Sequence, residues 1–215
     1  GDGRHRRPGS ATPIGGGGVL VMARPWRCVL LGTEPLLIEC AAMLIGRGHA
    51  IAAIVSETPA VRDWATSRNI ALLDTAADLL GAELGAIDHL FSITNLDILP
   101  AAITTLPTGL AINFHDGPLP DYAGLNTPAW ALINGEAEHG ITWHLMDAGV
   151  DTGPILLSRR FAIDPEDTAY TLNTKCFAAA IETFGPLLDA MEADTLAPRP
   201  QPHAPVRCFG RGHRP

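Results

Sequence analysis

The sequence lacks an excess of positive charge. Over 215 residues, 15 Lys and Arg stand against 23 Asp and Glu, which gives a formal net charge of −8. A protein that grips a nucleic-acid backbone normally carries a basic patch or stripe, and none stands out here. Hydrophobic residues make up 47% of the chain and charged residues 18%, the balance of a soluble globular protein. We therefore expect no nucleic-acid partner.

The sequence also lacks long apolar runs and paired cysteines. No segment approaches the roughly eighteen apolar residues of a membrane helix, so no membrane partner is expected. The four cysteines are scattered and no two have metal-ligand spacing: Cys28, Cys40, Cys176 and Cys208. We interpret each as a small buried hydrophobe or a surface thiol of a reduced, cytoplasmic protein, and we expect no metal.

The two ends of the chain differ in composition from the middle. Residues 1–24 carry positive charge but lack the apolar segment and cleavage site of a signal peptide, so we interpret them as a flexible leader or an expression remnant. Residues 194–215 contain five prolines and no apolar periodicity, which predicts a linker or tail. Residues 25–193 are predicted to form a single folded domain.

Within this domain, short apolar runs alternate with segments of helical periodicity. Strands are predicted at Arg27–Leu31, Ala50–Val55, Asn69–Leu73, Asp88–Ile93 and Gly109–Phe114, with helices at Glu34–Arg47, from about Pro59 and at Ala76–Leu84. A Gly- and Pro-rich loop should follow, then a helix from Pro128, strands at Ile141–Met146 and Pro154–Phe161, and a long helix from Glu166. The alternation predicts an α/β fold, Rossmann-like and doubly wound, with a mostly parallel sheet flanked by helices.

The turn after the first predicted strand is not a dinucleotide-binding turn. It reads Gly32-Thr-Glu-Pro35, so the G-x-G-x-x-G spacing is absent. Glu34 would repel a pyrophosphate, and Pro35 removes one of the amide donors that would bind it. A nicotinamide-dependent oxidoreductase is therefore a poor interpretation.

Two stretches carry residues suited to catalysis. Asn113 and His115 stand two apart at the end of a predicted strand, so both side chains leave the same face. Ligands of open α/β sheets bind beyond the carboxyl ends of the strands, where these residues lie. The second stretch places Asp147 and Asp151 on a glycine-bearing loop. Each residue alone is more often a turn former, a buried polar group or a cap, but the joint pattern favours a catalytic site.

In order and spacing, these stretches resemble the folate-dependent formyltransferase family. The shared elements are Asn113-Phe-His115, Leu119-Pro120, Tyr122-Ala-Gly124 and Asp147-Ala-Gly-Val-Asp151-Thr-Gly153. The resemblance spans Arg27 to Met191 and is closest in look to the formyltransferase domains of peptide synthetase and polyketide assembly lines. It implies that residues 25–193 are a formyltransferase catalytic domain with 10-formyltetrahydrofolate as co-substrate and no metal.

The resemblance also implies a role for each residue of a catalytic trio. An amine attacks the formyl carbon, and the oxyanion that develops would be stabilised by N–H groups of Asn113 and protonated His115. His115 would also pass a proton to the departing folate nitrogen. Asp151 would orient His115 and take the proton of the amine through a water.

A folate pocket is implied beside this trio. The loop after the fourth strand would contact the pterin largely through its backbone, and the loop from Asp147 to Asp151 would close the other side. The candidate cofactor-binding residues are Asn95, Leu96, Asp97, Ile98, Ile103, Asp147 and Val150. For Ile103, ordinary packing at the start of a helix is an equal alternative.

The motifs leave the acceptor amine open. Asp116 follows the histidine where better-known members carry Pro-Ser or Gly-Ser, and its carboxylate acts on His115, contacts a substrate amine or faces solvent. Members of this family that act on glycinamide ribonucleotide carry a glycine-rich phosphate loop after the first strand, and members that act on initiator tRNA usually add a basic C-terminal domain. This sequence shows neither feature, which disfavours both acceptors. We expect an aminoacyl group on a carrier protein, with an adjacent adenylation domain as a possible partner. The alternatives are an amino sugar nucleotide or other small amine, hydrolysis of 10-formyltetrahydrofolate, and a non-catalytic folate- or carrier-binding module.

Three residues near the motifs stay outside the candidate site. Trp130, Trp143 and His144 lie close to it in sequence and are placed to shape an acceptor pocket. Aromatic side chains at such positions more often pack in a core, so we assign them no role.

Overall fold

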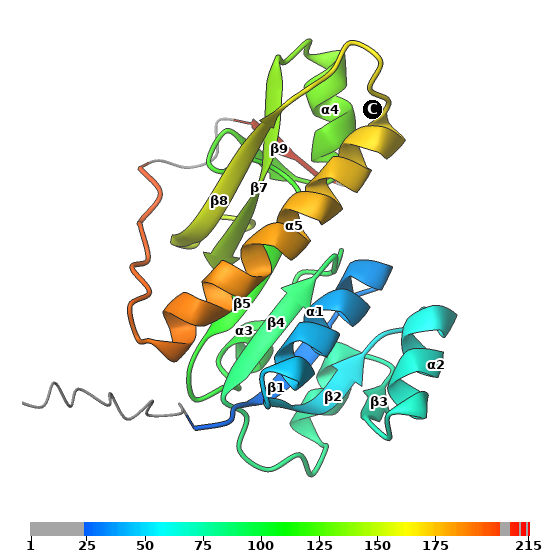
Figure 1. Ribbon diagram of the computed structural model, residues 1–215, viewed down its shortest axis with the longest axis vertical. Helices are drawn as coiled ribbons and strands as arrows, with labels where there is room; N and C mark the ends of the chain where they lie inside the picture. The colour runs from blue at the N-terminus through cyan, green and yellow to red at the C-terminus, as the bar shows by residue number, and fades with distance from the viewer. Residues whose placement is uncertain (1–23, 203–206, 211, 214) are drawn as a thin grey trace, which may run out of the picture.

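The computed structural model contains one seven-stranded sheet with helices on both faces (Figure 1). It describes residues 24–202, 207–210, 212, 213 and 215. The strands are β1 (Arg27–Leu31), β2 (Ala50–Val55), β3 (Ala71–Leu73), β4 (His89–Ile93), β5 (Ala111–His115), β6 (Tyr122–Gly124), β7 (Glu138–Leu145), β8 (Ile155–Ala162) and β9 (Arg207–Phe209). The helices are α1 (Pro35–Gly46), α2 (Pro59–Ser67), the 3-10 helix η1 (Ala76–Leu80), α3 (Ala101–Thr104), α4 (Thr127–Ile133) and α5 (Ala169–Glu192).

The order of strands in the large sheet is β3-β2-β1-β4-β5-β7-β8. The first five strands pair in parallel, whereas β7 runs antiparallel to both of its neighbours. This confirms the predicted doubly wound, mostly parallel sheet. The order reverses at β1, so that β4 and β5 lie side by side and their carboxyl ends open on the same edge.

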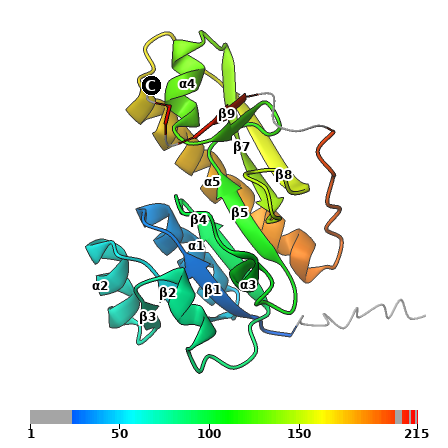
Figure 2. The same cartoon turned by 180° about the vertical axis from the view of Figure 1, so that it is seen from behind.

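Both faces of the sheet are covered, and β1 shows why. Cys28 and Leu30 point into one apolar core, while Val29 and Leu31 point into another. A strand buried on both faces has to be apolar throughout, which is typical of parallel sheets. The first core lies under α1, α2 and α5, and the second lies under η1 and α3. Figure 1 shows α1 and α5 in front of the sheet, and Figure 2 shows α3 on the opposite face.

The predicted elements agree with the structure best where the apolar runs are longest. The predicted ranges of β1 and β2 are those observed, whereas Ala76–Leu84 is a single 3-10 helix that ends at Leu80. The third strand starts at Ala71 and not at Asn69, because Asn69 adopts a left-handed conformation that ends α2. Two short strands were not predicted: β6 and β9.

The predictions for the two ends of the chain compare differently with the structure. The predicted leader, residues 1–24, lies outside the described residues except for Arg24. The predicted linker, by contrast, returns to the domain. Arg199 pairs with Ile155 through two backbone hydrogen bonds, and β9 adds to β6 as a parallel two-stranded sheet. Three residues give no recognisable periodicity, so the composition of this segment concealed its strand.

Candidate active site

A cavity of about 650 Å³ opens at the carboxyl ends of β4 and β5. Ser92 and Thr94 line it from the end of β4, and Asn113 and His115 line it from β5. The loops after β4 and before β8, the starts of α4 and α5, and β9 complete the wall. The cavity therefore lies where the fold class places its ligands.

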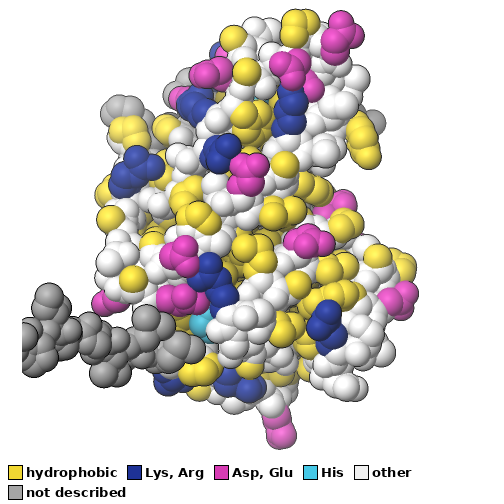
Figure 3. All heavy atoms as spheres, viewed as in Figure 1, with side chains coloured by type: hydrophobic (Ala, Val, Ile, Leu, Met, Phe, Trp, Pro, Cys, Tyr) yellow, Lys and Arg dark blue, Asp and Glu magenta, His cyan; other side chains and the backbone are white. Residues whose placement is uncertain are grey.

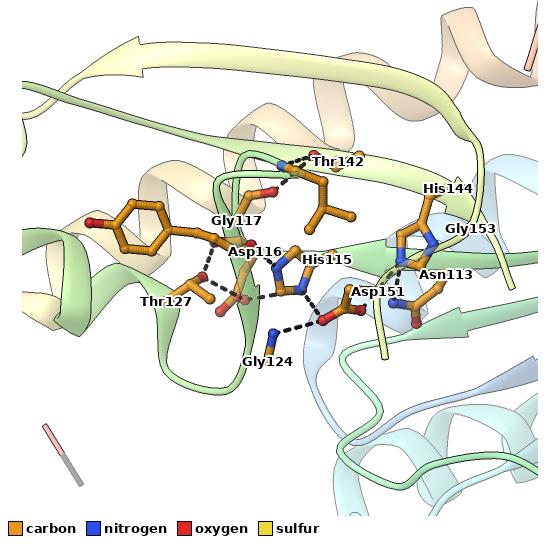
Figure 4. A network of polar contacts seen from close by, with 12 residues as sticks. Asn113, His115, Asp116, Gly117, Gly124, Thr127, Thr142, His144, Asp151 and Gly153 are labelled. Carbon is orange, nitrogen blue, oxygen red and sulfur yellow. Dashed lines mark hydrogen bonds and ion pairs between the residues drawn. The ribbon is translucent and has the colours of Figure 1, made fainter. Parts of the chain in front are cut away.

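The structure brings the predicted trio together: Asn113 and His115 lie on β5, and Asp151 lies on the loop before β8 (Figure 4). Asn113 lies opposite His144 in the antiparallel pairing of β5 with β7, and its amide nitrogen is 3.1 Å from His144 Nε2. The same Nε2 is 3.4 Å from Asp151 Oδ1. An amide NH2 has two hydrogens, so one remains to face a substrate oxygen.

His115 is held from two sides. Its Nε2 lies 2.8 Å from the Tyr122 carbonyl oxygen, which only accepts, so Nε2 carries a hydrogen. Its Nδ1 lies 3.5 Å from Asp151 Oδ2 and 3.9 Å from Asp116 Oδ1. Both distances are longer than a good hydrogen bond, so Nδ1 remains available to a bound ligand.

Asp151 is ionised in this setting. Burial alone would raise the pKa of its carboxyl group, but the charge of His115 and the neighbouring His144 ring act the other way. The Gly124 N–H, which donates to Asp151 Oδ2 over 2.8 Å, also favours the anion. Together these groups lower the pKa of Asp151 to about 2. At neutral pH this carboxylate is therefore a fixed negative charge beside His115.

Most of the predicted cofactor-binding residues line the cavity. Those that do are Asn95, Leu96, Asp97, Ile98, Asp147 and Val150. Leu96 and Ile98 are 63% and 79% exposed, and large apolar side chains at a cavity mouth are suited to a ring system that covers them. Ile103 is a correction: it is completely buried in the second core, with Val29 and Leu31, and does not reach the cavity.

Sequence reasoning left out two functional features. His144 was assigned no role, yet it contacts both Asn113 and Asp151. The structure supplies the signal: once β5 and β7 are known to pair, a polar residue opposite Asn113 has to share its face. The other feature is the backbone of β6, whose Tyr122 carbonyl and Gly124 N–H hold His115 and Asp151. Backbone contacts leave no trace in residue type.

The C-terminal segment completes one side of this site. Gln201 Nε2 donates to the carbonyl oxygens of Asp151 and Gly153, each at 2.8 Å. Phe209 stacks on Trp130, with ring centroids 4.6 Å apart and an interplanar angle of 8°. Cys208, Phe209 and Gly210 contribute to the cavity wall. The segment predicted to be a linker therefore supports the loop that carries Asp151.

Gly124 connects β9 to the trio, and its replacement by alanine should weaken the site. Gly124 has a φ of +87°, and a Cβ there would lie 2.2 Å from the Phe209 carbonyl oxygen. We expect Gly124→Ala to push β9 away, shift the N–H that holds Asp151, and lower kcat/KM at least about tenfold. The matched control is Gly135→Ala, which has a φ of +66° but open space around its Cβ. Both variants bear a backbone cost of about 1–2 kcal/mol. If the two variants lose activity equally, β9 does not support the site.

Within the described residues, no group of three or more His, Cys, Asp or Glu is placed to hold a metal ion. No helix in that part of the chain is long and apolar enough to cross a membrane.

An α/β fold with an Asn–His–Asp centre at the carboxyl edge of its sheet defines the class of this protein. Residues 73–184 match the sequence model of the formyl transferase family. The chain belongs to that family.

Curated relatives agree with this membership, and a solved structure shares the fold. The chain is 41% identical over 104 residues to a methionyl-tRNA formyltransferase of Thermodesulfovibrio yellowstonii, covering 48% of this chain and 34% of that protein. It is 31% identical over 194 residues to the methionyl-tRNA formyltransferase of Acetivibrio thermocellus, covering 82% and 62%. The N-formyltransferase from Helicobacter canadensis, solved with folinic acid and dTDP-3-aminofucose, has the same fold, with a TM-score of 0.74 at 21% identity and coverage of 87% and 71%. The chain thus spans less than two thirds of the length of both curated relatives.

Proposed function

We propose that this chain is a folate-dependent N-formyltransferase domain that moves a formyl group from 10-formyltetrahydrofolate to a substrate amine. The observation that carries the proposal is the meeting of Asn113, His115 and Asp151 at one cavity with an apolar rim. The family membership supports it, as do relatives named for formyl transfer. The folate is proposed to lie over Leu96 and Ile98, between the loop after β4 and the loop before β8.

In this proposal, each member of the trio has one task. The second amide hydrogen of Asn113 and the Nδ1 hydrogen of protonated His115 stabilise the oxyanion on the formyl carbon. His115 then gives a proton to the departing folate nitrogen. Asp151 keeps His115 oriented. Its low pKa makes it a weak base, so we assign it the orienting part of its expected role and not proton removal.

The acceptor is the finer part of the proposal: an aminoacyl group on a carrier protein. The curated relatives named above are methionyl-tRNA formyltransferases, and the solved structure contains a nucleotide sugar. These comparisons therefore do not favour a carrier-protein acceptor. The support is electrostatic. No Lys or Arg is among the described residues of the cavity wall to pair with the phosphates of a nucleotide-bearing acceptor. On the described part of the face in Figure 3, Lys and Arg are scattered among Asp and Glu and form no continuous basic patch.

The test is turnover with a panel of acceptors. Purified protein is incubated with 10-formyltetrahydrofolate and an aminoacyl carrier protein, an aminoacyl-tRNA or an amino sugar nucleotide, and both tetrahydrofolate and acceptor mass are followed. We expect a formyl mass gain on the aminoacyl carrier protein. A formyl mass gain on another acceptor would support the proposed reaction and contradict the proposed acceptor. Formate release without an acceptor would identify a hydrolase, and folate binding without turnover would identify a binding module.

A further inference from the structure

Asp116 is a carboxylate beside the catalytic histidine that the proposed reaction does not yet use. Its side chain is 30% exposed and lines the cavity, with Oδ1 3.9 Å from His115 Nδ1. It therefore flanks the same ring nitrogen as Asp151, which is 12% exposed and held by the Gly124 N–H. Both carboxylates line the cavity, and Asp116 is the more exposed of the two.

The backbone of Asp116 is anchored from three directions. Its carbonyl oxygen accepts from His139 Nε2 at 2.8 Å and from Thr127 Oγ1 at 2.6 Å, and Cys176 Sγ lies 3.8 Å away. Burial lowers the pKa of His139, so its ring is neutral and Nε2 carries the donated hydrogen. These donors come from β7, α4 and α5 and fix the backbone from which the carboxylate projects. Such preorganisation is typical of a group that binds a ligand.

The position of Asp116 places it on the acceptor half of the cavity. The loop after β4, where the folate is proposed to bind, forms one end of the wall. The other half is built by the starts of α4 and α5, with Pro128, Tyr170 and Asn173 in the wall. Asp116 contacts α4 through Thr127 Oγ1, which is 3.1 Å from its Oδ1. An amine that enters between α4 and α5 meets this carboxylate next to His115.

The charges of the wall favour a cation there. The described wall residues include five carboxylates and no Lys or Arg; the five are Glu34, Asp97, Asp116, Asp147 and Asp151. An acceptor amine is an ammonium ion in neutral solution, and it has to lose a proton before it attacks. A partly exposed carboxylate attracts the ammonium and gives its proton a route to solvent.

Resting on the proposed function, we infer that Asp116 docks the ammonium group of the acceptor and thereby selects acceptors that carry one. One N–H bond of the ammonium breaks, and the proton passes to Asp116 and on to solvent. The nitrogen lone pair forms a bond to the formyl carbon. The bond from that carbon to the folate nitrogen then breaks; that nitrogen takes a proton from His115, which regains one from the newly bonded nitrogen. The net products are a formamide, tetrahydrofolate and one released proton.

The experiment compares wild type with Asp116→Asn and Asp116→Glu. The probes are an aminoacyl N-acetylcysteamine thioester, which carries an ammonium group, and semicarbazide, which is uncharged at neutral pH. We expect Asp116→Asn to raise the KM for the thioester at least tenfold, with less than a threefold change for semicarbazide and for folate affinity. Asp116→Glu should restore part of the loss, because it retains the charge.

Each outcome separates this inference from the proposed function. A wild-type protein that formylates neither probe nor any acceptor of the panel removes the proposed function, and the role of Asp116 with it. Transfer by wild type with an unchanged thioester KM in Asp116→Asn overturns only the docking role. So does an equal loss of kcat with both probes, because that would mean that Asp116 acts through His115 and not on the acceptor.

Discussion

Replacement of His115 by alanine is expected to lower the rate of formyl transfer by about 10³–10⁴-fold, the range of a lost general acid combined with a lost oxyanion donor. The Nδ1 atom of His115 lies near two carboxylates, 3.5 Å from Asp151 Oδ2 and 3.9 Å from Asp116 Oδ1. The loss should appear in kcat more than in the KM for folate, because the ring is only 5% exposed and offers little surface to a ground-state ligand. Single-turnover kinetics with 10-formyltetrahydrofolate measure it.

The alanine variant also removes a buried ring, so its fold needs a control. His115→Gln keeps a polar side chain in the same space, and thermal unfolding with folate binding shows whether each variant is intact. His89→Ala is the matched control, since it deletes a half-buried imidazole at the opposite end of β4, far from the cavity wall. A folded His115→Gln protein that still turns over at more than a tenth of the wild-type rate contradicts the assignment.

The sequence predicted the sheet because a parallel sheet has to be apolar on both faces. β2 and the part of β1 after Arg27 are continuous apolar runs, and their ranges followed directly. The trio followed from residue types at fixed spacing, since Asn113 and His115 share a face whatever the rest of the fold does. Ile103 was misplaced for a related reason: an apolar residue fits a core as well as a pocket, and only the packing of α3 on the sheet decides between them.

What the sequence concealed depends on contacts between distant segments. His144 belongs to the site because β7 is antiparallel to β5, a pairing that sequence spacing does not specify. The tail was interpreted as a linker because its prolines dominate its composition, whereas Arg207–Phe209 pairs with β6 and Arg207 reaches Glu136 and the Tyr122 hydroxyl. These contacts join residues 71 and 85 positions apart in the chain. No local pattern reports on such pairs.

Asp151→Asn should be the second most damaging change, with a loss of about 10²–10³-fold in transfer, because it removes the negative charge that keeps His115 oriented. It should also destabilise the fold. A carboxyl group with a pKa of about 2 in the folded state and about 3.9 when unfolded contributes roughly 2–3 kcal/mol at neutral pH. The group is 12% exposed, so solvent screening reduces this value little. Kinetics and urea unfolding at pH 7 measure the two losses.

The pH dependence gives the sharper test, because its sign follows from the direction of the shift. The pKa of Asp151 is lowered in the folded state, so its stabilisation is complete above about pH 4 and is lost as the pH falls toward 2. The difference in unfolding free energy between wild type and Asp151→Asn should be constant from pH 7 to 5 and about half as large at pH 3. Asp121→Asn is the control, since Asp121 pairs with Arg160 at the surface, is 49% exposed and should contribute under about 1 kcal/mol at any pH. If the difference in unfolding free energy between wild type and Asp151→Asn does not change between pH 5 and 3, the pKa of Asp151 is not lowered to about 2 in the folded state. The orienting role that we propose for Asp151 would then have to pass to Asp116 or His144.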